Sequence, residues 1–195
     1  MMFKRTIVLI AFLIAGISAG MAQKAGIKTN LISDAVTSPN LGVEFKLAPK
    51  WTLDVSGQLN LWNIHERRWR HWMVMPEARY WLCEVFHGSF FALHALGGKY
   101  NVGNIHNNVK FLGSDFSQMT NYTFEGWGVG AGIGYGYSWI LAKHWNIEAE
   151  IGIGWIYTRY DKYRCFSCGD PVEKNHPHNY VGPTKLSVAI EYLFK

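Results

Sequence analysis

The chain has 195 residues, of which 49% are hydrophobic and 15% aromatic, with 20 glycines and 9 tryptophans. Beyond the first 22 positions no run of about 18 apolar residues occurs, which excludes a multi-helix membrane protein. The formal net charge is +5, and loss of Lys4 and Arg5 with a cleaved leader would leave +3. So small an excess of positive charge argues against a nucleic-acid partner.

The N-terminus has the pattern of an export signal. A positive pair precedes an apolar segment at residues 7–17, and the small residues Gly20 and Ala22 fit a cleavage site. The apolar segment is shorter than the roughly 20 residues that a membrane-spanning helix needs. We therefore expect a cleaved signal peptide over residues 1–22, with an uncleaved anchor as the alternative, and one mature domain over residues 23–195.

The mature sequence alternates apolar and polar side chains in about eight segments. They lie at residues 25–33, 40–47, 51–62, 73–82, 89–99, 123–139, 145–160 and 183–194. Successive side chains of a strand point to opposite faces, so each segment would have one apolar and one polar face. The connections are alternately short and long, as in outer-membrane barrels with periplasmic turns and termini. The pattern predicts an all-β protein, an eight-stranded antiparallel up-and-down transmembrane β-barrel.

The segment at 123–139 distinguishes a membrane barrel from a lipocalin. In a lipocalin the apolar face of each strand points inward around a ligand. Its odd positions, from Trp127 to Trp139, are mostly bulky and apolar, whereas glycines fill the even positions from Gly126 to Gly136. Glycine that faces a narrow lumen leaves room for long side chains from opposite strands. We therefore expect the bulky face to meet lipid, which disfavours a soluble ligand carrier.

The opposite, polar faces of the segments carry many charges. The interior of an eight-stranded barrel is only wide enough to be filled by side chains, so these charges are expected to pair across it. A static, filled lumen is the favoured interpretation, and a proton or ion path is the alternative. The predicted lumen charge network consists of Lys28, Glu44, Asp54, Glu77, Arg79, Glu148, Glu150, Lys185 and Glu191.

Short blocks of the sequence point to a family. They read KTNL at 28–31, PNLGVE at 39–44, WTLD at 51–54, EGWG at 125–128, WNIE at 145–148 and GPTK at 182–185. These blocks resemble a family of small outer-membrane β-barrel proteins of Gram-negative gut anaerobes that carry a domain of unknown function. The resemblance implies an envelope location, a barrel fold and, for some members, association with fimbrial genes. It supplies no catalytic residues.

The last long connection carries a possible metal motif. Cys165 and Cys168 have the C-x2-C spacing, and His176 and His178 follow. Two thiolates and two imidazoles suit a tetrahedral zinc site. In an exported protein a local disulfide is the favoured interpretation, with zinc and free thiols as alternatives, so no cofactor other than zinc is expected. Cys83 lies in a turn at the predicted opposite end, beyond disulfide reach.

The connection at 63–72 is rich in arginine and tryptophan. It contains Arg67, Arg68, Trp69, Arg70 and Trp72. Guanidinium groups bind phosphates in bidentate fashion, and indole rings favour the membrane interface. The segment is therefore a candidate contact for lipopolysaccharide, with a solvated loop beside an aromatic belt as the alternative.

The connection at 100–122 contains the candidate catalytic residues of an alternative, enzymatic function. His106, Ser114 and Asp115 are residue types that a lipid-acting outer-membrane enzyme would use, but no nucleophile elbow frames them. We therefore expect a non-enzymatic outer-membrane barrel with a structural role or with loops that bind lipopolysaccharide, a surface protein or a fimbrial component. A barrel enzyme acting on lipids is the alternative.

Overall fold

The computed structural model describes residues 25–61, 63–64, 67–104, 110–111, 114–115, 122–164 and 170–194. The expected signal peptide lies outside these residues. Within the described part of the chain, no helix has the length and apolarity needed to cross a membrane.

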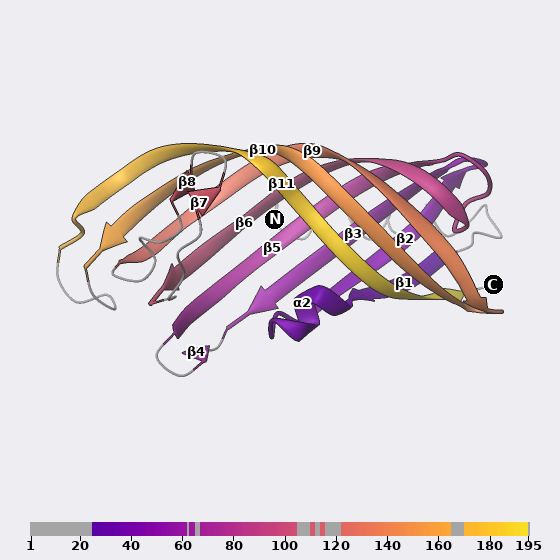
Figure 1. Cartoon of the computed structure of the whole chain (residues 1–195), viewed down its shortest axis with the longest axis horizontal. Helices are drawn as coiled ribbons and strands as arrows, with labels where there is room; N and C mark the ends of the chain where they lie inside the picture. The colour runs from indigo at the N-terminus through magenta and orange to yellow at the C-terminus, as the bar shows by residue number, and fades with distance from the viewer. Residues whose placement is uncertain are drawn as a thin grey trace, which may run out of the picture.

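Eight long antiparallel strands of the described chain form one closed sheet (Figure 1). Each strand pairs with the next one along the chain, and β1 pairs with β11 from Ala25↔Phe194 onward, which closes the ring. The predicted all-β, eight-stranded antiparallel up-and-down barrel is confirmed. The strands are β1 (Ala25–Asn30), β2 (Asn40–Ala48), β3 (Trp51–Asn60), β5 (Arg67–Trp81), β6 (Gly88–Gly103), β9 (Thr123–Ala142), β10 (Trp145–Tyr163) and β11 (Glu173–Phe194).

Four short elements complete the described structure. The helix α2 (Leu31–Ala35) follows β1, and β4 (Asn63–Ile64) pairs with the start of β5. A small separate hairpin is formed by β7 (Lys110–Phe111) and β8 (Ser114–Asp115).

The two ends of the barrel differ. The turns at 49–50, 82–87 and 143–144 lie at one end together with Ala25 and Phe194, and we call this the turn end. The long connections lie at the other end, the loop end. Strands β1 to β3 have 6 to 10 residues, whereas β5 to β11 of the closed sheet have 15 to 22. The longer strands therefore project beyond α2 at the loop end, and β10 and β11 reach furthest (Figure 1).

The first strand is shorter than expected. The alternation predicts a strand over 25–33, but β1 ends at Asn30 and α2 begins at Leu31. The side-chain oxygen of Asn30 accepts hydrogen bonds from the backbone N–H of Ile32 at 3.1 Å and of Val188 at 3.2 Å. The first bond caps the helix, and the second fixes its start to β11. This local cap overrides the alternating pattern.

Other strands are longer than expected. β5 begins at Arg67 rather than at residue 73, and β11 begins at Glu173 rather than at residue 183. The pairing of β10 with β11 continues to Lys162↔Glu173. In this part of the two strands, both faces of the sheet carry polar side chains. Hydrophobic periodicity detects only the part of a strand that has one apolar face. The connections expected at 63–72 and 161–182 are therefore largely sheet.

The barrel is apolar outside and charged inside. Ile133 and Leu93 are 61% and 62% exposed, whereas Glu77 and Arg79 are 1% and 2% exposed. Along β9 the bulky residues face outward, and a Cβ added to Gly132 would meet the His94 ring. The predicted directions of the bulky and glycine faces of residues 123–139 are confirmed.

Candidate functional site

An aromatic plug, formed by Trp81, Phe86 and Phe90, closes the lumen at the turn end. These three side chains are at most 2% exposed, and the rings of Trp81 and Phe90 lie 4.7 Å apart. Trp81 Nε1 donates a hydrogen bond to Thr52 Oγ1 at 2.9 Å, which satisfies the buried indole N–H. Phe86 comes from the turn between β5 and β6, so this turn folds back into the barrel.

Arg79 is the centre of the charged layer next to the plug. Its guanidinium carbon lies 4.5 Å from the centroid of the Phe90 ring. Its nitrogens donate hydrogen bonds to four carboxylates, Glu77 at 2.6 Å, Glu44 at 2.7 Å, and Glu148 and Glu150 at 3.0 Å each, and one lies 3.3 Å from a fifth, Asp54. One guanidinium can serve this many partners because it presents five N–H donors.

Two lysines complete the charged layer. Lys28 Nζ pairs with Glu44, with Glu148 at 3.1 Å and with Asp54 at 3.3 Å, and it lies 3.9 Å from Glu191. Lys185 Nζ lies 2.6 Å from Glu77 Oε2 and 2.9 Å from Glu150 Oε2. The structure thus brings together all the residues of the predicted lumen charge network, namely Lys28, Glu44, Asp54, Glu77, Arg79, Glu148, Glu150, Lys185 and Glu191.

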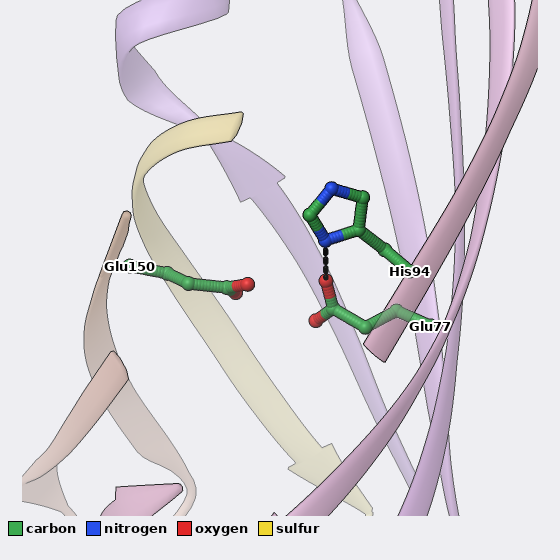
Figure 2. Close-up of side chains that lie close together, drawn as sticks. All are labelled: Glu77, His94 and Glu150. Atoms are coloured by element: carbon green, nitrogen blue, oxygen red, sulfur yellow. Dashed lines mark ion pairs between the residues drawn. The ribbon is translucent and has the colours of Figure 1, made fainter. Parts of the chain in front are cut away.

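His94 joins this layer and was not among the predicted residues. It is 1% exposed and lies opposite Glu77 in the β5–β6 ladder. Its Nε2 is 2.8 Å from Thr184 Oγ1, and its Nδ1 is 3.7 Å from Glu77 Oε2. Figure 2 shows His94 and Glu77 on adjacent strands, with the Glu150 carboxylate pointing toward them from the other side of the lumen.

Three glycines leave space for these side chains. A Cβ added to Gly132 would lie 2.6 Å from His94 Nε2, and one added to Gly152 would lie 2.8 Å from His94 Cε1. A Cβ added to Gly134 would lie 2.9 Å from Glu150 Oε1. We call these three glycines the glycine cradle. Gly132 and Gly134 belong to the glycine row that the sequence shows in β9, and Gly152 lies in β10.

The lumen becomes polar and hollow toward the loop end. A cavity of about 180 Å³ is bordered by Lys28, Arg79, Thr184 and Lys185, and also by Asn30 and Ser33 near α2. Nearer the mouth, a second cavity of about 550 Å³ is lined by residues that include His71, Tyr100 and Tyr160. In the described part of the chain, the lumen is thus hollow at the loop end and filled at the turn end.

The arginine-rich segment is the start of β5 rather than a loop. Strand alternation places Arg68, Arg70 and Trp72 on the outward face and Trp69 on the inward face. Trp69 Nε1 lies 3.4 Å from Ser38 Oγ inside the mouth, so this indole is not part of an outward contact surface. The side chain of Arg67 lies outside the described residues.

A groove on the outer surface lies beside Trp72. Its volume is about 560 Å³, its floor includes Ala95 and Gly97, and Trp72 and Trp127 flank it. Lys99 lies between these two tryptophans in the sheet, paired with Trp72 on one side and Trp127 on the other. We call this feature the outer groove.

The residues of the predicted zinc or disulfide motif are only partly described. His176 and His178 belong to β11 rather than to a loop, where they pair with Tyr160 and Thr158. Cys165 and Cys168 lie outside the described residues. Cys83 is an exposed free thiol in the turn between β5 and β6.

The residues of the alternative enzyme hypothesis give no site geometry. His106 lies outside the described residues. Ser114 and Asp115 make up the strand β8, but their side chains lie outside the described part of the structure.

A closed sheet of eight strands, with an apolar outer surface and a buried charge network, defines the chain as a small up-and-down barrel of inverted polarity. The chain belongs to the family described as "Protein of unknown function (DUF3575)", whose model matches residues 7–194. No curated protein sequence matches it. The crystal structure of Neisserial surface protein A is similar, with 14% identity over 88% of this chain and 96% of that chain and a TM-score of 0.38.

Proposed function

We propose that this protein is an integral outer-membrane barrel without enzymatic activity, which anchors its loop end at the cell surface. The observation that carries the proposal is the inverted polarity of the barrel. Its outward face exposes Leu93, Ile133 and Val181 by 61% to 64%. If this face were in water, each such side chain would lose the roughly 1.5–3 kcal/mol of free energy that its burial provides, whereas a bilayer provides an apolar environment for it.

The arrangement of the ends supports a cell-surface orientation. Outer-membrane barrels have short periplasmic turns and longer external loops, with both termini in the periplasm. The turn end of this barrel contains the short turns at 49–50 and 143–144 together with Ala25 and Phe194. A strand of about 9–11 residues is enough to cross the bilayer. β10 and β11, with 19 and 22 residues, would therefore extend well beyond it and form the surface that a fimbrial or other surface protein would meet.

A filled lumen supports a structural role rather than transport. The aromatic plug blocks the turn end, and Arg79 with its carboxylate partners fills the adjacent layer. An eight-stranded barrel has room inside for little more than its own side chains. We therefore expect the intact barrel not to conduct ions.

Lipopolysaccharide is the partner that the outer surface favours. Arg68 and Arg70 project outward near the loop end, and Lys99 lies on β6 opposite Trp72. The outer groove, of about 560 Å³, has a mostly apolar lining between Trp72 and Trp127 and would accept an acyl chain. Cations above an aromatic belt match a phosphorylated lipid whose chains enter the membrane.

Fractionation and electrical recording test the proposal together. We expect the protein in the outer-membrane fraction, extractable only by detergent, with migration in gels that changes on heating. In planar bilayers it should give no ion current. Release with the periplasmic contents, or steady channel currents from the pure protein, would contradict the proposal.

Lipid binding is tested with charge variants. Replacement of Arg68, Arg70 and Lys99 by alanine should reduce the lipopolysaccharide that copurifies with the barrel. Lys50→Ala with Lys143→Ala removes charge at the turn end and should leave the copurified amount unchanged. Equal loss in both variants would show that the contact is not specific to this surface.

A further inference from the structure

We propose that the lumen binds one divalent transition-metal ion, such as Zn²⁺, through Glu77, His94 and Glu150 (Figure 2). One ligand atom from each of these side chains can be chosen so that all three lie within 4.8 Å of one another. An imidazole with carboxylates is a ligand set that suits zinc and similar ions. This site shares no residue with the motif of Cys165, Cys168, His176 and His178.

Two buried side-chain atoms of the three proposed ligands have no hydrogen-bond partner. His94 Nδ1 and Glu150 Oε1 are buried and have no hydrogen-bond partner within the described structure. His94 is 1% exposed and Glu150 is 4% exposed, so bulk water does not reach them freely. Buried polar atoms without a partner are costly, and a metal ion would satisfy both at once.

The surroundings of His94 are those of a metal ligand. A ligating histidine generally donates its second ring N–H to an oxygen that fixes the ring orientation. Here Thr184 Oγ1 lies 2.8 Å from His94 Nε2, which leaves Nδ1 to face Glu77. The glycine cradle keeps the space around the imidazole and around Glu150 free of side chains.

The ammonium group of Lys185 lies between two of the proposed ligands. Its Nζ lies between Glu77 Oε2 and Glu150 Oε2, at 2.6 and 2.9 Å. The lysine side chain also borders the cavity of about 180 Å³, so it has space into which it can withdraw. The network contains six carboxylates and three cationic side chains, Lys28, Arg79 and Lys185. A divalent ion would offset this excess of negative charge, in competition with the Lys185 ammonium.

Zinc content of the folded barrel provides the first test. The mature protein, folded in detergent, is dialysed against ZnCl₂ and then against metal-free buffer, and zinc is measured by mass spectrometry. We expect one zinc per barrel, retained in a variant that combines Cys165→Ser, Cys168→Ser, His176→Gln and His178→Gln. In that background His94→Gln and Glu150→Gln should each lose the ion. No bound zinc, or zinc that disappears with the four loop-end replacements, would overturn the proposal.

Two milder variants have opposite expected effects. Thr184→Val should weaken zinc binding by about 10–100-fold, because the imidazole loses its orienting partner. Lys185→Met should strengthen binding, because it removes the competing ammonium. A purely structural network predicts no zinc dependence in either variant. These two measurements decide the question even where His94→Gln fails to fold, as judged by heat-dependent gel migration.

Cobalt identifies the ligands by spectroscopy. Co²⁺ bound by nitrogen and oxygen should give visible absorption without the intense near-ultraviolet band of thiolate ligands. Such a thiolate band from the wild-type barrel, with no visible absorption left in the loop-end variant, would place the metal at Cys165 and Cys168 instead.

Discussion

At the residue scale, the lumen depends on Arg79 more than on any other side chain. Its guanidinium binds Glu44, Glu77, Glu148 and Glu150, and it is 2% exposed. Removing one partner of a buried ion pair leaves uncompensated charge, at a cost of about 3–5 kcal/mol. Arg79→Met should lower the free energy of unfolding by at least this amount, measured by urea titration in lipid vesicles. Arg159→Met, on the outward face near the loop end, should change it by less than about 0.5 kcal/mol.

The glycine cradle gives a second prediction at this scale. Gly132→Ala would bring a Cβ to 2.5 Å from the backbone oxygen of Ile153 and 2.6 Å from His94 Nε2, so it should destabilise the barrel by about 1–3 kcal/mol. Gly57→Ala is the matched control, because no heavy atom lies within 4 Å of a Cβ added there. Equal unfolding free energies for the two variants would show that the space beside His94 is not needed.

The sequence predicts charged residues of the lumen better than it predicts His94. The alternation of side chains along each strand is enough to place Lys28, Glu77 and Lys185 on inward faces. His94 stands between Leu93 and Ala95 in a part of β6, residues 88–98, whose other side chains are apolar or small, so no charge pattern surrounds it. Only the β5–β6 register, which sets it opposite Glu77, brings it into the network. Register depends on pairing between strands, which no single segment encodes.

At the element scale, alternation predicts the part of each strand that would lie in lipid. It fails where both faces of the sheet carry polar side chains, as at the start of β5 and of β11. It also fails at Asn30, where a side-chain cap ends β1 and starts α2. The misplaced boundary at β5 matters for function, since strand geometry separates Trp69 from Arg68 and Arg70.

Asn30 supports a prediction about this junction. Asn30→Ala removes the cap on Ile32 and the bond to Val188, so it should cost about 0.5–2 kcal/mol of unfolding free energy. Asn179→Ala removes one exposed bond, which Trp155 Nε1 donates at 3.0 Å, and should cost less. A larger loss in the second variant would contradict the role of Asn30 as the link between α2 and β11.

At the scale of the whole molecule, the lumen has two unlike ends. The aromatic plug seals the turn end, the charge network fills the middle, and cavities of about 180 and 550 Å³ occupy the side toward the loops. Anything that reaches the charge network from solution must therefore enter from the loop end. If that end faces the exterior, the metal site inferred above would be supplied from outside the cell.

The orientation of the barrel can be tested with its own cysteine. Cys83 is an exposed free thiol at the turn end, so in our proposed orientation it faces the periplasm. In cells that carry Cys165→Ser and Cys168→Ser, a membrane-impermeant maleimide should label Cys83 only after the outer membrane is permeabilised. Lys174→Cys, at an exposed position of β11 near the loop end, should be labelled in intact cells when Cys83 is replaced by serine. Labelling of Cys83 in intact cells would mean that the turn end is outside, and the long strands and the mouth of the lumen would then face the periplasm.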